Sequence, residues 1–340
     1  MRRRIASALT AAALLTGLAA CGEVRGSDEK ESGGGAAEKK EGPLQVAVVP
    51  KAVGFDFWEQ VRKGAECAAS KQKDVTVSWD GVAAESDVTG QISLLQNFVT
   101  QGVGAMVFAA TDAKALGPVV EQATGKDIPV AMIDSGVDPL PDGVPLFATD
   151  NIAGAEKVAD LMAEEVGSEG GKVALIEFNP GSQTNNERTK GFEQGLKRHP
   201  DLELVAKQNS ESDANKALRI TEDVLSANPD LKGIFASNES NALGAATAVR
   251  RAGKDGEVVI IGWDAAPDEL KAIREGTISA VIVQNPFNMG FKGVNAAVSM
   301  AREGATVESA DTGSTVVTKD NLDDAEVKAV LEPSCANPPT

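Results

Sequence analysis

From Leu44 onward, short apolar runs alternate with segments in which apolar residues recur every three or four positions. Most of the runs are continuous rather than alternating, which is typical of strands that helices cover on both faces. We predict strands at residues 45–49, 76–79, 105–109, 130–133, 172–177, 233–236, 258–262 and 279–283. The segments between them predict helices at 57–72, 88–101, 153–166, 184–199, 214–227 and 241–251.

This order of strand, helix and strand predicts a parallel, doubly wound sheet. The pattern occurs twice, at 44–134 and again at 172–264, without close sequence repetition. We therefore expect an α/β protein with two doubly wound parallel-sheet domains joined by a hinge, and a cleft between the domains.

The N-terminal region is predicted to be a targeting segment. Residues 1–20 begin with three arginines and continue as an uncharged stretch that is too short to span a bilayer comfortably, as in a signal peptide. The sequence Leu-Ala-Ala-Cys at 18–21 resembles a bacterial lipobox, in which the cysteine, here Cys21, is lipidated. Residues 21–43 are rich in Gly, Ser, Glu and Lys and are predicted to form a flexible tether.

Composition excludes several classes of protein. The chain has 33 Lys and Arg against 50 Asp and Glu, a formal charge of −17 that argues against a general nucleic-acid binder. Its single histidine, His199, lies at an apparent helix end, so a Ser-His-Asp triad has no support, and one histidine with scattered cysteines does not assemble a zinc site. No segment has the spacing of a phosphate-binding or dinucleotide-binding loop. We expect no enzymatic activity, no cofactor and no metal.

Polar side chains end several of the predicted strands. In open α/β sheets a ligand lies beyond the carboxyl ends of the strands, so these residues are the candidates for a site. They are Lys51, Asp134, Asn238, Asp264 and Gln284. Carboxylates, amides and an ammonium can together bind several hydroxyl groups. The alternative is that these residues only cap the helices that follow, as Asp and Asn commonly do.

The chain resembles the type I, ribose-binding-like substrate-binding proteins of bacterial ABC importers over nearly all of residues 44–318. The resemblance rests on Pro50-Lys51 with Phe57-Trp58, Ile133-Asp134, Asn186-Glu187-Arg188, Ser237-Asn238-Glu239, Gly262-Trp263-Asp264 and Val283-Gln284. It implies two domains that close over a small sugar and deliver it to a membrane permease. By position, Asp134, Asn238, Asp264 and Gln284 resemble hydroxyl-binding residues, and Phe57 and Trp58 an aromatic lip.

The match has two departures. The family usually has an arginine where this chain has Asn186, with Arg188 two residues later, and a family aromatic residue aligns near Ser212, which cannot stack. Both Asn186 and Arg188 remain candidate ligand-binding residues.

The resemblance implies a division of the chain into two lobes and a tail. We expect a first lobe at 44–149 plus 285–311, a second at 150–284 plus 312–319, and a C-terminal tail at 320–340. The expected protein is an extracytoplasmic, lipid-anchored monomer that contacts the membrane only through its lipid, binds no nucleic acid and serves an ABC permease. The alternative is a receptor subunit that presents the bound sugar to a membrane sensor kinase.

The charges of the candidate site favour a neutral ligand. Asp134 and Asp264 repel an anion, and Lys51 and Arg188 can both be used in neutralising them. We expect a neutral monosaccharide or cyclic polyol, whose apolar face is covered by Trp58 together with Phe57 or Trp263. We expect Glu239, the residue after Asn238, to lie outside the site.

Two cysteines remain besides Cys21. Cys67 and Cys335 can form a disulfide in an exported protein, and this bond would fasten the tail to the first domain. Alternatively, Cys67 is a buried free thiol on a face of small residues.

Overall fold

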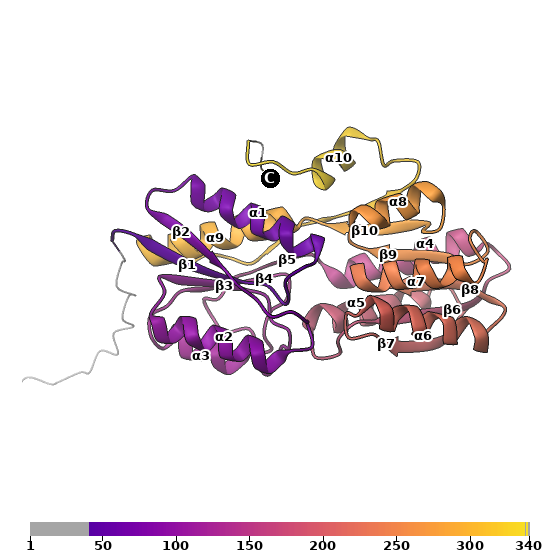
Figure 1. Cartoon of the computed structure of the whole chain (residues 1–340), viewed down its shortest axis with the longest axis horizontal. Coiled ribbons are helices and arrows are strands. Elements are labelled where there is room, and N and C mark those ends of the chain that lie inside the picture. The colour runs from indigo at the N-terminus through magenta and orange to yellow at the C-terminus, as the bar shows by residue number, and fades with distance from the viewer. Residues whose placement is uncertain (1–40, 337, 339–340) are drawn as a thin grey trace, which may run out of the picture. The chain divides into compact units, whose positions relative to one another are not determined.

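The structure is a computed structural model that describes residues 41–336 and residue 338 (Figure 1). The predicted signal peptide and Cys21 lie outside the described residues, as does the tether up to residue 40. Within the described part of the chain, no helix combines the length and the apolar character needed to cross a membrane.

The first lobe is built on a six-stranded sheet in the order β11-β5-β4-β3-β1-β2, and its paired strands are parallel. Its strands are β1 (Leu44–Val49), β2 (Val75–Trp79), β3 (Ala105–Phe108), β4 (Val130–Ile133), β5 (Leu146–Ala148) and β11 (Ala310–Asp311). Helices α1 (Asp56–Ser70) and α9 (Pro286–Glu303) cover one face, and α2 (Val88–Gln101) and α3 (Gly117–Thr124) cover the other (Figure 1). Both faces of the strands are therefore buried, which explains their continuous apolar sequences.

The second lobe repeats this arrangement with the order β12-β10-β9-β8-β6-β7. Its strands are β6 (Gly171–Glu177), β7 (Leu202–Asn209), β8 (Leu231–Ala236), β9 (Val259–Trp263), β10 (Ala280–Gln284) and the antiparallel edge strand β12 (Ser314–Thr318). Helices α4 (Asn151–Val166) and α5 (Gln183–Leu196) pack on one face. On the other face lie α6 (Ala214–Ala227), α7 (Glu239–Arg251), α8 (Pro267–Glu275) and α10 (Ala325–Leu331). The predicted α/β fold with two mainly parallel sheets is confirmed.

Three short connectors join the lobes in the described part of the chain. They lie between β5 and α4, between β10 and α9, and between β11 and β12. The first and third connectors are bonded to each other, because Thr312 N–H donates to the Ala148 carbonyl at 2.9 Å and Asp150 N–H donates to Asp311 at 3.2 Å.

Helix α1 is fixed by a very close contact with α9. Gly64 of α1 lies against the backbone of Phe287, and Gly290 of α9 lies against the backbone of Val61. A Cβ atom at either glycine would collide with the facing carbonyl oxygen, so only glycine permits this approach. The contact holds the N-terminal end of α1, with Phe57 and Trp58, beside the carboxyl ends of the first sheet.

The C-terminal segment 320–336 connects the two lobes. Its helix α10 packs on the second lobe, where Val327 is buried beside Leu322 and Leu331 packs against the same cluster. Four residues after the end of α10, Cys335 is disulfide-bonded to Cys67 of α1 in the first lobe. The sequence predicted that this bond fastens the tail to the first domain. The bond does so only at the end of the tail, because α10 packs on the second lobe.

We expect this disulfide to stabilise the fold. The double variant Cys67→Ala with Cys335→Ala should lose about 2–4 kcal/mol of unfolding free energy, because the closed loop spans 268 positions and its closure restricts the unfolded chain. Urea unfolding of the oxidised wild type and the double variant measures the loss. A reducing agent should lower the wild-type midpoint and leave that of the variant unchanged. Equal midpoints for the oxidised wild type and the variant would contradict the prediction.

Candidate functional site

A cavity lies between the two lobes, beyond the carboxyl ends of their strands. Residues after β1, β2 and β4 line it from the first lobe, and residues after β6, β8 and β9 together with the last residue of β10 line it from the second. This is the position at which an open α/β sheet binds its ligand. Eight of the nine residues predicted from sequence to contact a ligand line this cavity.

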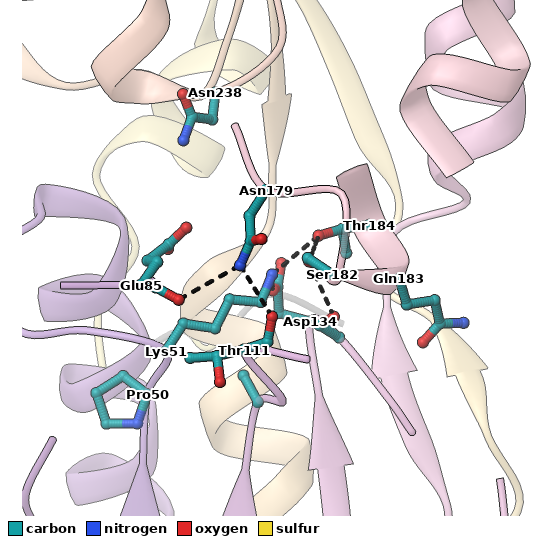
Figure 2. A network of polar contacts seen from close by, with 12 residues as sticks. Pro50, Lys51, Glu85, Thr111, Asp134, Asn179, Ser182, Gln183, Thr184 and Asn238 are labelled. Carbon is teal, nitrogen blue, oxygen red and sulfur yellow. Dashed lines mark hydrogen bonds and ion pairs between the residues drawn. The ribbon is translucent and has the colours of Figure 1, made fainter. Parts of the chain in front are cut away.

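An ion pair dominates the first-lobe wall. Lys51 is the second residue after β1. Its ammonium contacts the Asp134 carboxylate at 2.7 Å, and both residues are buried. The same ammonium donates a hydrogen bond to the Thr184 hydroxyl of the second lobe at 2.8 Å (Figure 2). Lys51 therefore neutralises Asp134 and also connects the two lobes.

Asp134 and Asp264 have the same unusual backbone conformation. Each follows its strand, β4 or β9, and the φ angles are +56° and +84° respectively. Positive φ is uncommon outside glycine, although aspartate tolerates it better than most residues, and such conformations often mark functional sites. The two lobes thus present one carboxylate each to the cavity in the same local way.

On the second-lobe wall, the polar groups bind one another. Gln284 Nε2 donates to Asp264 Oδ1 at 2.8 Å, and Asn238 Nδ2 donates to the Ser212 hydroxyl at 3.0 Å. Asn238 Oδ1 accepts from Asn241 N–H at the start of α7, so Asn238 is a helix cap as well as a wall residue. Among the described residues, Gln284 Oε1 is buried without a hydrogen-bond partner. That oxygen is available to accept a hydrogen bond from a ligand.

Arg188 is held rigidly in the wall. Its Nε donates to Asn151 Oδ1 at 2.9 Å, and a terminal nitrogen donates to the Ser237 carbonyl at 2.8 Å. The guanidinium lies over the Trp263 ring at 4.2 Å. Burial lowers the Arg188 pKa, while the charges of Asp264 and Asp134 act in the opposite direction. Since two of its donor nitrogens are already used, Arg188 is poorly placed to grip an anion from two sides.

Burial acts on Asp264 as well. It raises the pKa of this carboxyl group, and the positive charge of Arg188 and the hydrogen bond from Gln284 oppose the rise. A ligand hydroxyl that donates to Asp264 would favour the ionised form further.

Phe57 and Trp58 supply an apolar part of the wall. Their rings meet edge to face with centroids 4.8 Å apart, and both line the cavity. Trp58 Nε1 donates to Glu85 at 3.3 Å, so this ring is fixed. Trp263, the other candidate for covering a sugar, is fully buried beneath Arg188 and does not line the cavity.

Asn186 does not face the cavity, contrary to prediction. It is exposed on α5, whereas Thr184 and Arg188 of the same helix line the cavity. Residues four apart on a helix share one face, and a residue midway between them lies on another. The helical spacing of Arg188 thus explains why it, rather than Asn186, occupies the wall.

Several lining residues were missed from sequence. They are Phe55, Glu85, Phe178, Thr184 and Glu239. Glu85 and Phe178 follow β2 and β6, so the rule of strand ends could have found them. Glu239 was placed outside the site and this was wrong, because α7 starts at this residue and turns its side chain toward α1, where it accepts from Phe57 N–H.

Direct contacts hold the two lobes together around the cavity. Glu85 accepts a hydrogen bond from the Ser212 hydroxyl at 2.6 Å, and Asn179 donates to the carbonyls of Glu85 and Thr111 (Figure 2). Gly136 N–H donates to Gln183 at 2.7 Å. The structure is therefore a closed arrangement of the lobes. Across the described residues, no cluster of three or more His, Cys, Asp or Glu side chains is placed to hold a metal ion.

A family model described as "Periplasmic binding protein domain" matches residues 46–306. The chain belongs to the periplasmic-binding-protein family. A D-allose-binding periplasmic protein of Escherichia coli is 31% identical over 77% of this chain and 86% of its own length. The ribose import binding protein of Bacillus subtilis is 33% identical over 69% of this chain and 74% of its own length.

Solved structures agree with this assignment. An ABC transporter solute-binding protein from Agrobacterium vitis with bound D-fucose superposes with a TM-score of 0.80 at 38% identity, over 84% of this chain and 99% of that one. The family member described here is thus an extracytoplasmic solute-binding protein of the type I sugar-binding class found in ABC transporters. Relatives of this class are binding proteins rather than enzymes, in agreement with the prediction from sequence.

Proposed function

We propose that this protein captures a neutral monosaccharide or cyclic polyol between its two lobes and passes it to an ABC permease. The supporting observation is the composition of the cavity wall. Four carboxylate side chains, of Glu85, Asp134, Glu239 and Asp264, share the wall with two cationic ones, of Lys51 and Arg188. Acceptor groups exceed cationic partners, so a ligand rich in hydroxyl donors fits and an anion does not.

The donors already on the wall strengthen the argument against an anion. Lys51 is paired with Asp134, and Arg188 is bonded to Asn151 and to the Ser237 carbonyl. An incoming carboxylate or phosphate would have to displace these contacts and lie close to Asp264 and Glu239. A neutral polyol has no negative charge for Asp264 and Glu239 to repel and need not displace these contacts. The Phe57 and Trp58 rings offer an apolar surface on which its C–H groups can pack.

The relatives bind several different sugars. Besides D-allose, ribose and D-fucose, a solved solute-binding protein from Agrobacterium radiobacter was in complex with D-arabinose at 33% identity and a TM-score of 0.81, over 85% of this chain and 99% of that one. A xylitol-binding protein of Mycolicibacterium smegmatis is 27% identical over 97% of this chain and 89% of its own length. This range supports the class of ligand, a small neutral polyol, rather than one sugar.

We also propose that a lipid on Cys21 holds the protein at the membrane surface. The support is the sequence Leu-Ala-Ala-Cys after an apolar stretch, followed by a polar tether. We infer that the roughly twenty residues after Cys21 let the two lobes reach a permease in the same membrane.

A thermal-shift screen tests the ligand class. Neutral ligands such as D-fucose, D-allose, D-ribose, D-arabinose, xylitol and myo-inositol should include at least one that raises the unfolding temperature, because binding to the folded state alone stabilises it. D-Glucuronate and ribose 5-phosphate serve as anionic counterparts and should leave it unchanged. A larger shift with an anionic counterpart than with every neutral ligand would overturn the proposal.

Calorimetry on two variants tests the proposed site. With the best neutral ligand, Asp264→Ala should weaken binding by about tenfold or more, because a buried hydroxyl left without its acceptor costs about 1–3 kcal/mol. Asn186→Ala is the matched control on the exposed side of α5 and should leave affinity unchanged. Unchanged affinity in Asp264→Ala would count against this site.

Cell fractionation tests the anchor. We expect Cys21→Ser to move the protein from the membrane fraction to the soluble extracytoplasmic fraction, because the lipid attachment atom is lost. Metabolic labelling with a radioactive fatty acid should mark the wild type only. A variant that stays in the membrane fraction would show that the lipobox assignment is wrong.

A further inference from the structure

The N-terminus of α1 lacks a cap from its own lobe. Its N-cap residue is Phe55, whose side chain cannot accept a hydrogen bond. The first backbone N–H groups of a helix have no partner within the helix, and the helix dipole makes this end favourable for a carboxylate. The partner of Phe57 N–H, in the first turn, is instead Glu239 Oε2 of the second lobe at 3.2 Å.

Glu239 contacts residues of both lobes at the cavity. It is the first residue of α7, directly after the wall residue Asn238, and its own N–H donates to Asp264 Oδ2 at 3.3 Å. Its side chain is nine-tenths buried and lines the cavity. One residue thus joins the start of α1 in the first lobe to a ligand-facing carboxylate in the second.

We propose that Glu239 is a positioning residue for closure: it caps α1 from the opposite lobe, so that the helix end carrying Phe57 and Trp58 is completed only when the lobes close. The inference rests on the proposed closure of the lobes over a ligand. The contact crosses between lobes, so opening breaks it and returns the carboxyl group to water.

The surroundings of Glu239 make this cap sensitive to protons. Asp264 after β9 and Asp56 of α1 are the acidic groups that act on it, Glu239 in turn acts on Glu269 of α8, and Lys51 and Arg188 are the cations of the shared cavity. Burial, then the charge of Asp264, raises the Glu239 pKa to about 7, although the amides at the start of α1 favour the charged form.

The sign of the resulting pH dependence follows from this shift. In the open form the carboxyl group faces water, where an ordinary glutamate titrates near 4.3. Closure therefore takes up a proton between about pH 5 and pH 7, and the closed form is favoured on the acidic side of this window. Ligand affinity should fall by about tenfold or more as pH rises from 5 to 7.5, and then level off.

Two substitutions separate the cap from the charge. Glu239→Gln keeps an acceptor for Phe57 N–H but cannot ionise. Between pH 5 and 7.5, the logarithm of its ligand affinity should therefore change less than half as much as that of the wild type. It should also bind more tightly than the wild type at pH 7.5. Glu239→Ala loses the acceptor and should bind about threefold or more weakly than Glu239→Gln at pH 5. Glu165→Gln, on the exposed side of α4, is the matched control and should keep the wild-type profile.

The test combines calorimetry at pH 5 and 7.5, using the best neutral ligand of the screen, with small-angle scattering of the ligand-free proteins at the same pH values. Scattering needs no ligand, so it separates failure of this inference from failure of the sugar assignment. The ligand-free wild type should have a larger radius of gyration at pH 7.5 than at pH 5, and Glu239→Gln should not. A variant Glu239→Gln that keeps the wild-type pH dependence in both measurements would overturn the inference.

Discussion

The cavity between the lobes depends on how buried carboxylates find partners. An isolated charge is costly to bury, so each carboxylate in this wall must be paired or must accept hydrogen bonds. Asp134 is paired with Lys51, Asp264 accepts from Gln284, and Glu85 accepts from Trp58 and Ser212. Among these contacts, the one between Ser212 and Glu85 crosses from one lobe to the other, as does the hydrogen bond from Phe57 N–H to Glu239. Closing the cleft therefore completes the hydrogen bonds of Glu85 and Glu239, whereas Asp134 and Asp264 have partners within their own lobes, and a polyhydroxylated ligand supplies further donors to the wall.

The rest of the fold brings these groups together and limits their freedom. Parallel strands deliver Lys51, Asp134, Asp264 and Gln284 to facing edges of two sheets, and the glycine contact between α1 and α9 sets the position of the aromatic residues. The C-terminal segment adds a fourth covalent path between the lobes, besides the three connectors, through the Cys67–Cys335 bond.

Sequence predicted the buried strands well because helices on both faces leave a continuous apolar pattern. The strand-end rule then located five of the thirteen residues that line the cavity, and the family resemblance added Phe57, Trp58 and Arg188. Sequence missed the two edge strands of the second sheet, β7 and β12, whose residues are mostly half-buried or exposed, and the very short β5 and β11. It also misplaced Asn186 and Glu239. Asn186 lies on the exposed face of α5, two residues from the face that carries Arg188. The hydrogen-bond partner of Glu239 lies 182 positions away in the other lobe, so the local sequence gives no signal of the contact.

A ligand-bound crystal structure tests the central claim most directly. With a saturating neutral ligand from the thermal-shift screen, the account predicts that ring hydroxyls lie within hydrogen-bond distance of both Asp134 of the first lobe and Asp264 of the second, with the ring against Phe57 and Trp58. A ligand that contacts the carboxylates of one lobe only, or that lies outside this cavity, would contradict it.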